Sequence, residues 1–353
     1  MTTSTLRPSV ITSSSHLPLG SLVRCLEQFP DAQFDLFVLR DPDLRDLQSQ
    51  LKLTGDKLSV ETVLEMQGSI ESICDWVGEH ATTLMRAPNR IMTVPPVGAL
   101  ATYFPLISSR DANEIKSVVS SMVGCIKLAV RLKEKGHSDI PVIEIVCGSR
   151  VSFCKCDRCK ADGNRGFILP ERDAIAQVLD VLLQVVEIAE QDRAVKKSEW
   201  ALALEFEPGG LYSLGSAEAL TSLFAALQVD KYKSLKNRVG INVDVGHMRI
   251  AKIPAQFFEE ENRSNLIVHS HICDNPGMHT RDMPMGMWTP IDGSATFDIE
   301  YLSLFEKARE TVSSRPNGLP FSGSVALELE GCSRVQWIVQ GVAGLRHLLG
   351  NLP

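Results

Sequence analysis

Three short segments of the sequence share one pattern: ALALE at residues 201–205, GINVD at 240–244 and SVALE at 324–328. In each, bulky aliphatic residues alternate with small or polar residues, and an acidic residue comes last. Side chains on a β-strand alternate between its two faces, so each segment is predicted to be a strand with one bulky and one small or polar face. The bulky face suits covering helices, and the other face suits the interior of a barrel with the carboxylate at its mouth.

The rest of the chain alternates between strand and helix patterns. Between the strands lie amphipathic stretches such as 114–135 and 173–190, whose apolar residues recur at helical spacing. This alternation predicts right-handed βαβ units, a parallel sheet and an α/β fold, specifically a (β/α)8 TIM barrel. The alternative is an open doubly wound sheet, but the sequence has no glycine-rich phosphate turn after an early strand. The predicted strands are 8–13, 34–39, 90–94, 141–146, 200–205, 239–244, 265–271 and 324–328.

No sequence repeat, Ser/Gly linker or low-complexity tract divides the chain, and 353 residues can bury a sizeable core. We therefore expect residues 1–353 to form a single TIM-barrel domain. Its enlarged parts are a crossover at 40–89, with helical patterns at 44–53 and 60–81, and a Cys-rich loop at 147–166.

The composition, with 44% hydrophobic and 22% charged residues, is that of a globular protein. A formal net charge of −7 argues against nucleic acid or an anionic membrane as the main partner. No apolar run reaches the roughly 18–20 residues of a membrane span, and the first residues lack an apolar stretch of signal-peptide length. We expect a cytoplasmic protein with a small-molecule substrate; a homo-oligomer is compatible with these features.

Four residues at the ends of four predicted strands form a candidate metal site: Glu205, Asp244, His271 and Glu328. Carboxylates with an imidazole suit a divalent cation such as Mn, Mg, Co or Zn, and the strand ends meet at the barrel mouth. Taken singly, an acid at a strand end is often a helix cap and a histidine is often a hydrogen-bonded core residue. The recurrence of the pattern on four strands favours a metal site.

The sequence around these residues resembles the xylose isomerase-like TIM-barrel superfamily. This group includes sugar and sugar-phosphate isomerases and epimerases, inosose dehydratase-type lyases and endonuclease IV-type enzymes. The resemblance extends from about residue 198 to the end, and in the first half it concerns only the strand order. The motifs that carry it are LALEFEPGG (202–210), INVDVGH (241–247), VHSHICDN (268–275), PMGMWTPIDG (284–293) and GSVALELEG (323–331).

The resemblance implies roles for individual residues. It makes the four strand-end residues the metal ligands, and His247 a contact of the substrate or of a ligand. In an isomerase of this kind Glu205 and Glu328 also move the proton, while the metal polarises a carbonyl and its neighbouring hydroxyl and stabilises an enediolate.

Two further acids are alternatives to the chosen glutamates. Glu207 and Glu330 each lie two residues beyond a proposed ligand and so share its strand face. We choose Glu205 and Glu328, the latter because its distance from Gly323 matches the last strand of the superfamily.

The sequence departs from the endonuclease IV-type pattern. The predicted third strand, IMTVPP at 91–96, has no histidine, and Thr280 and Asp282 stand where an Asp/His pair is expected. These differences argue against a three-zinc phosphodiesterase. Met287 and Trp288 replace the usual glycine-rich continuation; Trp288 either stacks on a sugar face or fills the loop.

Four of the nine cysteines are close together, as Cys147-x6-Cys154-x-Cys156-x2-Cys159. Four thiolates can hold a structural zinc, which would pin a long loop over the barrel mouth. Alternatively, Cys147 is a core residue and the other three are surface thiols, or Cys156 and Cys159 form a redox dithiol.

We therefore predict a divalent-metal-dependent isomerase or epimerase that acts on a sugar or polyol-derived carbonyl compound through an enediolate. The alternative is a metal-dependent lyase (dehydratase) acting on a cyclitol or keto acid, followed by a metal-dependent hydrolase or a non-catalytic binding module. Salt bridges from the mouth acids to Arg150 or Arg281 would favour the binding module. Arg150 and Arg281 are also candidate phosphate contacts, and His16 is a candidate substrate contact.

Overall fold

A computed structural model gives the structure of the chain. It describes residues 6–12, 19–38, 45, 47–49, 63–64, 67–85, 96–153, 166–278, 283–287, 296–316, 318–329 and 334–352.

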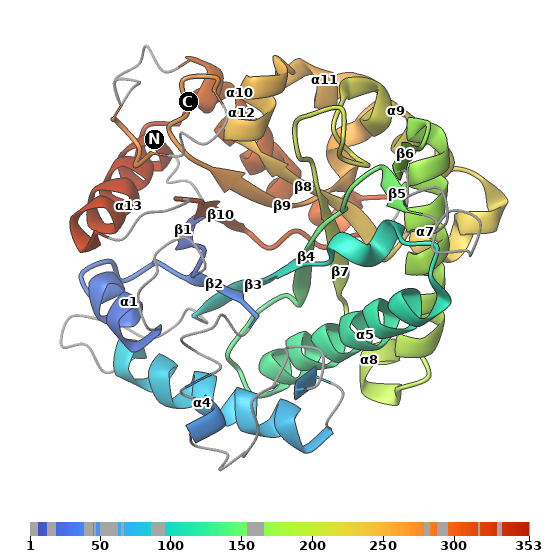
Figure 1. Ribbon diagram of the computed structural model, residues 1–353. Helices are drawn as coiled ribbons and strands as arrows, with labels where there is room; N and C mark the ends of the chain where they lie inside the picture. The colour runs from blue at the N-terminus through green and yellow to red at the C-terminus, as the bar shows by residue number, and fades with distance from the viewer. Residues whose placement is uncertain are drawn as a thin grey trace.

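Eight parallel strands pair in the order β1-β10-β9-β8-β7-β4-β3-β2. The two ends of this order meet through a parallel bridge between Ile11 and Asp35 and a 2.9 Å bond from Thr12 N to Asp35 O. The sheet therefore closes into a (β/α)8 barrel, and Figure 1 shows the helices surrounding the strands. The strands are β1 (Arg7–Val10), β2 (Phe34–Phe37), β3 (Val97–Tyr103), β4 (Val142–Val146), β7 (Ala201–Glu205), β8 (Val239–Asp244), β9 (Ile267–Ile272) and β10 (Ser324–Leu327).

The helices follow the strands in the alternating order that the sequence predicts. Asp111 begins the longest of them, α5, by accepting hydrogen bonds from the main-chain N–H groups of Asn113 and Glu114. The α-helices are α1 (Leu19–Leu26), α4 (Gln67–Met85), α5 (Ala112–Glu134), α7 (Glu171–Ala189), α8 (Arg193–Lys197), α9 (Ala217–Ala226), α10 (Val245–Ala251), α11 (Gln256–Glu259), α12 (Thr296–Glu310) and α13 (Val335–Gly350). Short 3-10 segments are η1 (Pro105–Ser108), η2 (Asp230–Leu235), η3 (Glu260–Leu266) and η4 (Val312–Ser314). In the part of the chain that the structure describes, no helix is long and apolar enough to cross a bilayer.

The predicted division of the strands into two faces is confirmed. Leu202, Leu204 and the matching aliphatic residues of β8 and β10 belong to the large core shared with the helices. Ala201 and Ala203, on the other face of β7, belong to a separate cluster. The inner faces of the late strands are therefore lined mostly by small and polar residues.

The third strand differs from the prediction. Residues 90–94 lie outside the described residues, and the barrel strand is β3, seven residues further along the chain. Its sequence VGALATY consists mostly of small residues, so its composition does not signal a strand. β3 contains no histidine. The argument against a three-zinc site depends on the absence of a histidine from the third strand.

The long connections are also described in part. In the 40–89 crossover α4 confirms the second helical pattern, whereas most of 44–53 lies outside the described residues. After β4 the chain forms an antiparallel hairpin of β5 (Val151–Phe153) and β6 (Gly166–Ile168).

Candidate metal centre

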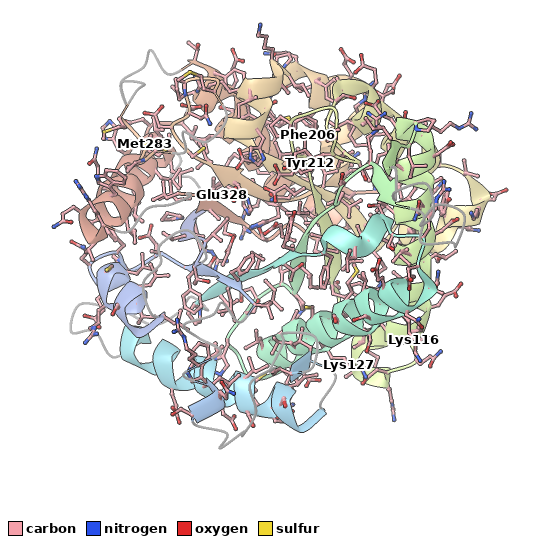
Figure 2. The ribbon with its side chains drawn as sticks, in the orientation of Figure 1. Lys116, Lys127, Phe206, Tyr212, Met283 and Glu328 are labelled. Carbon is pink, nitrogen blue, oxygen red and sulfur yellow. The ribbon has the colours of Figure 1, made fainter. Side chains whose placement is uncertain are left out.

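Four side chains from four adjacent strands converge at the carboxyl end of the barrel. Glu205 ends β7, Asp244 ends β8, His271 lies near the end of β9, and Glu328 directly follows β10. One ligand atom from each of the four lies within 4.8 Å of the others. A shared cation with bonds of roughly 2.0–2.6 Å requires such separations. Figure 2 shows Glu328 inside the ring of helices.

His271 lies at the centre of the group. Its Nδ1 is 3.2 Å from Glu205 Oε1 and 3.3 Å from Glu328 Oε2. Asn242 Nδ2 lies 3.1 and 3.2 Å from the two ring nitrogens. The Nδ1 edge of the ring thus faces the carboxylates that would share a cation.

Two buried carboxylate oxygens of the group accept no hydrogen bond from the described residues. Asp244 Oδ1 accepts a 2.7 Å bond from the main-chain N–H of His247 and caps α10, but Asp244 Oδ2 makes no hydrogen bond with any described residue. Glu328 Oε2 also makes none with the described residues, although His271 Nδ1 is close to it. Buried polar atoms are normally satisfied, so these oxygens fit a cation.

The electrostatics of the group also favour a cation. Burial opposes ionisation of Glu205, but the hydrogen bond and positive charge of His271 outweigh it and lower the pKa of Glu205 to about 2. Burial, together with the negative charges of Glu205 and Asp244, raises the pKa of Glu328 well above its usual range. Burial favours the neutral ring of His271, yet its bond to Glu205 and the surrounding acids raise its pKa. The group therefore holds more acid than one histidine can neutralise.

Glu144 is a further acid that sequence reasoning missed. It lies in the middle of β4, is 3% exposed, and places Oε2 3.8 Å from His271 Nε2. Burial and the charge of Glu205 raise its pKa well above the usual range. A charged residue inside the otherwise Val/Ile strand VIEIV was the available signal, because the sequence argument considered only strand ends.

His247 and Glu207 lie beside the group rather than in it. His247 Nδ1 is 2.9 Å from the main-chain oxygen of Phe206 and 3.9 Å from Glu205 Oε1. His247 Nε2 is 3.9 Å from Glu207 Oε2, and the Glu207 side chain is 24% exposed. The structure thus brings Glu205 rather than Glu207 into the four-residue group. Glu330 lies outside the described residues.

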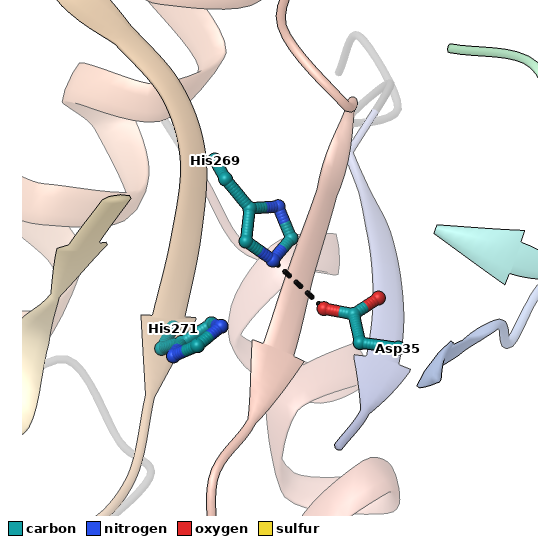
Figure 3. Close-up of side chains that lie close together, drawn as sticks. All are labelled: Asp35, His269 and His271. Atoms are coloured by element: carbon teal, nitrogen blue, oxygen red, sulfur yellow. Dashed lines mark hydrogen bonds and ion pairs between the residues drawn. The ribbon is translucent and has the colours of Figure 1, made fainter. Parts of the chain in front are cut away.

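A second buried cluster lies next to the first. Figure 3 shows His269, two residues before His271 on β9, joined to Asp35 of β2. His269 Nε2 donates to Asp35 Oδ2 at 2.8 Å, and His269 Nδ1 lies 2.8 Å from Ser322 Oγ. The two imidazole rings meet edge to face, with centroids 5.0 Å apart. Asp35, His269 and His271 also offer ligand atoms within 4.8 Å of one another, but this cluster is satisfied by its own hydrogen bonds.

Arg150 does not neutralise the mouth acids. Its Nη1 is 3.0 Å from Glu171 Oε1 and 3.1 Å from Gly210 O, and its Nε donates to Leu169 O at 2.8 Å. Arg150 therefore does not form the salt bridge to the mouth acids that would have favoured a non-catalytic binding module. Arg281, Thr280, Asp282, Trp288 and His16 lie outside the described residues.

The predicted zinc cluster is described only at its first cysteine. Cys147 follows β4 and is buried in an apolar pocket, where burial raises the pKa of its thiol. The pocket is lined by residues that include Ile175, Val178, Leu204, Leu214 and Leu223. Cys154, Cys156 and Cys159 lie outside the described residues, between the paired ends of the β5–β6 hairpin. The four-thiolate site stays a prediction.

Comparison with known proteins gives similarities of fold. No family model matches the chain, and no curated protein matches it. A xylose isomerase domain protein from Alicyclobacillus acidocaldarius subsp. acidocaldarius is 13% identical with a TM-score of 0.49, covering 97% of this chain and 99% of that one. SacUVDE is 10% identical with a TM-score of 0.42, covering 98% and 99%. XEG5A, a GH5 xyloglucan-specific endo-beta-1,4-glucanase from a metagenomic library in complex with cellotriose, is 6% identical with a TM-score of 0.43, covering 98% and 96%.

Proposed function

We propose that this chain is a divalent-metal-dependent isomerase or epimerase acting on a sugar or polyol-derived carbonyl compound. The observation that carries the proposal is the convergence of three carboxylates and one imidazole within 4.8 Å at the barrel mouth. Donors of this kind suit Mn, Mg, Co or Zn. The two buried oxygens without hydrogen-bond donors among the described residues support a cation at this place.

The residues present fit the proposed chemistry. Glu205, Asp244, His271 and Glu328 would hold the ion, which supplies Lewis-acid polarisation of a carbonyl and its neighbouring hydroxyl. Glu205 and Glu328 both approach the same His271 ring nitrogen. In the proposed reaction a carboxylate oxygen of one glutamate takes the proton from the carbon next to the carbonyl, which gives an enediolate. The other glutamate returns a proton, either to the opposite face of the same carbon (epimerase) or to the former carbonyl carbon, while the hydroxyl proton passes to the former carbonyl oxygen (isomerase).

His247 would orient the substrate or Glu205. Its Nδ1 bonds the main-chain oxygen of Phe206, which leaves Nε2 on the side of Glu207. We propose that His247 contacts the substrate or steadies Glu205 by this placement.

Manganese binding and hydrogen exchange test the proposal together. The full chain is loaded with Mn²⁺, which thiolates bind poorly, so that the cysteine loop does not contribute. Electron paramagnetic resonance should show about one bound ion, and His271→Ala should abolish it. Glu187→Gln, an exposed acid on α7, is the control and should bind as the wild type does.

The loaded protein is then incubated in heavy water with ketoses, cyclitol ketones and keto acids. An isomerase washes deuterium into the carbon next to the carbonyl, whereas a lyase also loses water from the product. A hydrolase or a binding module exchanges no deuterium. If the wild type binds none of Mn²⁺, Mg²⁺, Co²⁺ and Zn²⁺ in a way that His271→Ala abolishes, the proposal is wrong.

A further inference from the structure

The barrel mouth has a second half, opposite the acids. The strand register places Tyr103 of β3 beside Val146 of β4, and Val146 beside Glu205 of β7. Ala99 and Ala101 of β3 belong to interior clusters, so Tyr103, with the same parity, also faces inward. At the level of Glu205, one inward-facing position beyond Glu144, the inner face of the mouth therefore continues through the apolar side chains of Val146 and Tyr103.

Apolar side chains also lie next to Glu328, on the side of β1. Ile11 bonds the main chain of β10 directly before Glu328, through Ile11 N and Leu327 O at 3.1 Å. Ile11 clusters with Ala101 inside the barrel, and Phe37 packs against that cluster. The four strands β7–β10 thus carry the four-residue group, while the mouth above β1–β3 is lined by apolar side chains among the described residues.

Four exposed apolar side chains lie at or beyond the carboxyl ends of β3, β4 and β7. We name Tyr103, Leu106, Ile168 and Leu211 the apolar arc; they are 53%, 46%, 56% and 54% exposed. They lie at the end of β3 and in the connections that follow β3, β4 and β7. Large hydrophobic residues gathered at the mouth of a barrel are typical of a ligand site.

Hydrogen bonds hold the connections of the arc together. Ser108 Oγ donates to Ser149 O at 2.5 Å, which joins the β3 and β4 connections. Arg150 N donates to Leu211 O at 2.6 Å, and Leu169 N donates to Arg150 O at 3.0 Å. The arc is therefore a built surface in which Ile168 and Leu211 are close to the same residue, Arg150.

The charge of the two halves also differs. The acids belong to β7–β10, whereas the four residues of the arc carry no positive charge, and Arg150 beside them is already bonded to Glu171. A phosphate at the far end of a substrate would find no counter-charge among the four residues of the arc. An apolar ring face would bury hydrophobic surface there.

We infer that the substrate is an unphosphorylated carbonyl compound whose non-reacting part is a ring with an apolar face, seated on the apolar arc. This inference rests on the proposed function, because it assumes that the oxygen-bearing end of the substrate lies at the acids. Tyr103 and Glu205 are two strand spacings apart, about 10 Å. One six-membered ring with adjacent oxygens spans that separation.

Two pairs of small ketones test the inference on the Mn²⁺-loaded full chain. The first pair is 2-hydroxycyclohexanone and acetoin, which share the α-hydroxyketone group but differ in the ring. The second pair is dihydroxyacetone and dihydroxyacetone phosphate. Binding is measured from the paramagnetic relaxation of the ligand protons, which does not depend on turnover.

The ring compound should bind about tenfold more tightly than acetoin, as two further buried methylenes imply. Dihydroxyacetone phosphate should bind no better than dihydroxyacetone. Leu211→Ser and Tyr103→Ser should reduce the ring preference to about twofold or less. Val229→Ser, at an equally exposed apolar position (52%) after α9, is the matched control and should leave the preference unchanged.

Several results would overturn the inference. Equal binding of the ring and open-chain ketones, or tighter binding of the phosphate ester, would do so. A Leu211→Ser change that dissociates an oligomer in sedimentation velocity without altering the ring preference would assign the arc to a second copy of the chain instead. A ring preference without deuterium exchange in any compound would uphold the arc as a ligand site while removing the isomerase function.

Discussion

Strand β9 carries two histidines that face the same interior and have opposite surroundings. His269 has a partner at 2.8 Å on each ring nitrogen, and its acid, Asp35, also accepts bonds from Ser9 Oγ and the main chain of Ala99. His271 has several acids around it, and two of the nearby carboxylate oxygens make no hydrogen bond with any described residue. A buried polar cluster whose atoms all hydrogen-bond to one another serves to hold strands together. A buried cluster with more negative than positive charge is instead suited to bind a cation.

The positions of the two clusters in the barrel explain this difference. His269 lies one inward-facing position deeper than His271 and reaches Asp35 next to the place where β1 and β2 close the barrel. The deeper cluster ties β9 to β2 across the interior, with the parallel bridge of Ile11 and Asp35 beside it. The outer cluster lies at the carboxyl ends of the strands, where barrel enzymes have their active sites.

The largest expected effect comes from breaking the deeper cluster. Asp35→Ala leaves three buried donors without their acceptor, namely His269 Nε2, Ser9 Oγ and Ala99 N. Since each unsatisfied buried donor costs about 1–3 kcal/mol, the free energy of unfolding should fall by at least about 3 kcal/mol. Urea denaturation of the full chain measures this loss. The Mn²⁺ affinity should change less than about tenfold, because Asp35 contacts none of the four proposed ligands through a hydrogen bond in the described structure.

The opposite outcome would show that the two clusters act as one metal centre. If Asp35→Ala or His269→Gln abolishes Mn²⁺ binding while stability stays within about 1 kcal/mol of the wild type, the two histidines belong to one metal centre. The distances among Asp35, His269 and His271 permit that arrangement.

A smaller effect of the opposite kind is expected at the outer cluster. Asp244→Asn keeps an N-cap oxygen for His247 N but removes a buried negative charge. Without metal, the variant should be at least as stable as the wild type. At a Mn²⁺ concentration of 100 Kd the wild type gains about 2.7 kcal/mol, and the variant should gain almost none.

Thermal unfolding with and without Mn²⁺ measures this difference, with Glu187→Gln as the control. An Asp244→Asn chain that keeps the full Mn²⁺-dependent gain would show that Asp244 is no ligand of the ion and acts only as the cap of α10.

The outer cluster could be predicted from sequence, and the deeper one was not. Glu205, Asp244 and Glu328 each follow a local alternation that is visible within five residues. The contact of His269 with Asp35 joins residues 234 positions apart and exists only because the barrel closes. His269 has the same strand parity as His271, which was the one local signal for it.

The early strands show a different limit. β3 carries Ala99 and Ala101 inward, where the closed barrel needs small side chains, and this removes the β-branched composition by which strands are recognised. Cys147 shows a third limit, since its position in an apolar pocket is set by helices that lie far along the chain. Local patterns therefore predicted seven of the eight barrel strands, including β1, β2 and β4, whereas tertiary packing determined the position of β3 and the surroundings of Cys147.

The smallest expected effect is a pH dependence of stability in the metal-free protein. The pKa of Glu328 in the folded chain is raised by burial first and then by the charges of Glu205 and Asp244. A raised folded pKa leaves stability intact below the ordinary carboxyl value of about 4.3 and removes it as pH rises through the folded value. Between those two pKa values, stability falls by about 1.4 kcal/mol for each pH unit.

Glu328→Gln should remove this dependence, since its amide does not ionise. In chelator the variant and the wild type should unfold alike near pH 4, and the variant should become the more stable chain as pH rises toward 8. Added Mn²⁺ should reverse that order, because the ion binds the ionised carboxylate that metal-free folding disfavours. Glu144 keeps its own raised pKa in both chains, so the informative quantity is their difference in unfolding free energy at each pH. A difference that stays constant from pH 4 to 8 would mean that Glu328 ionises as easily in the folded chain as in the unfolded one, and the surplus of buried charge that separates the two histidine clusters would then be absent.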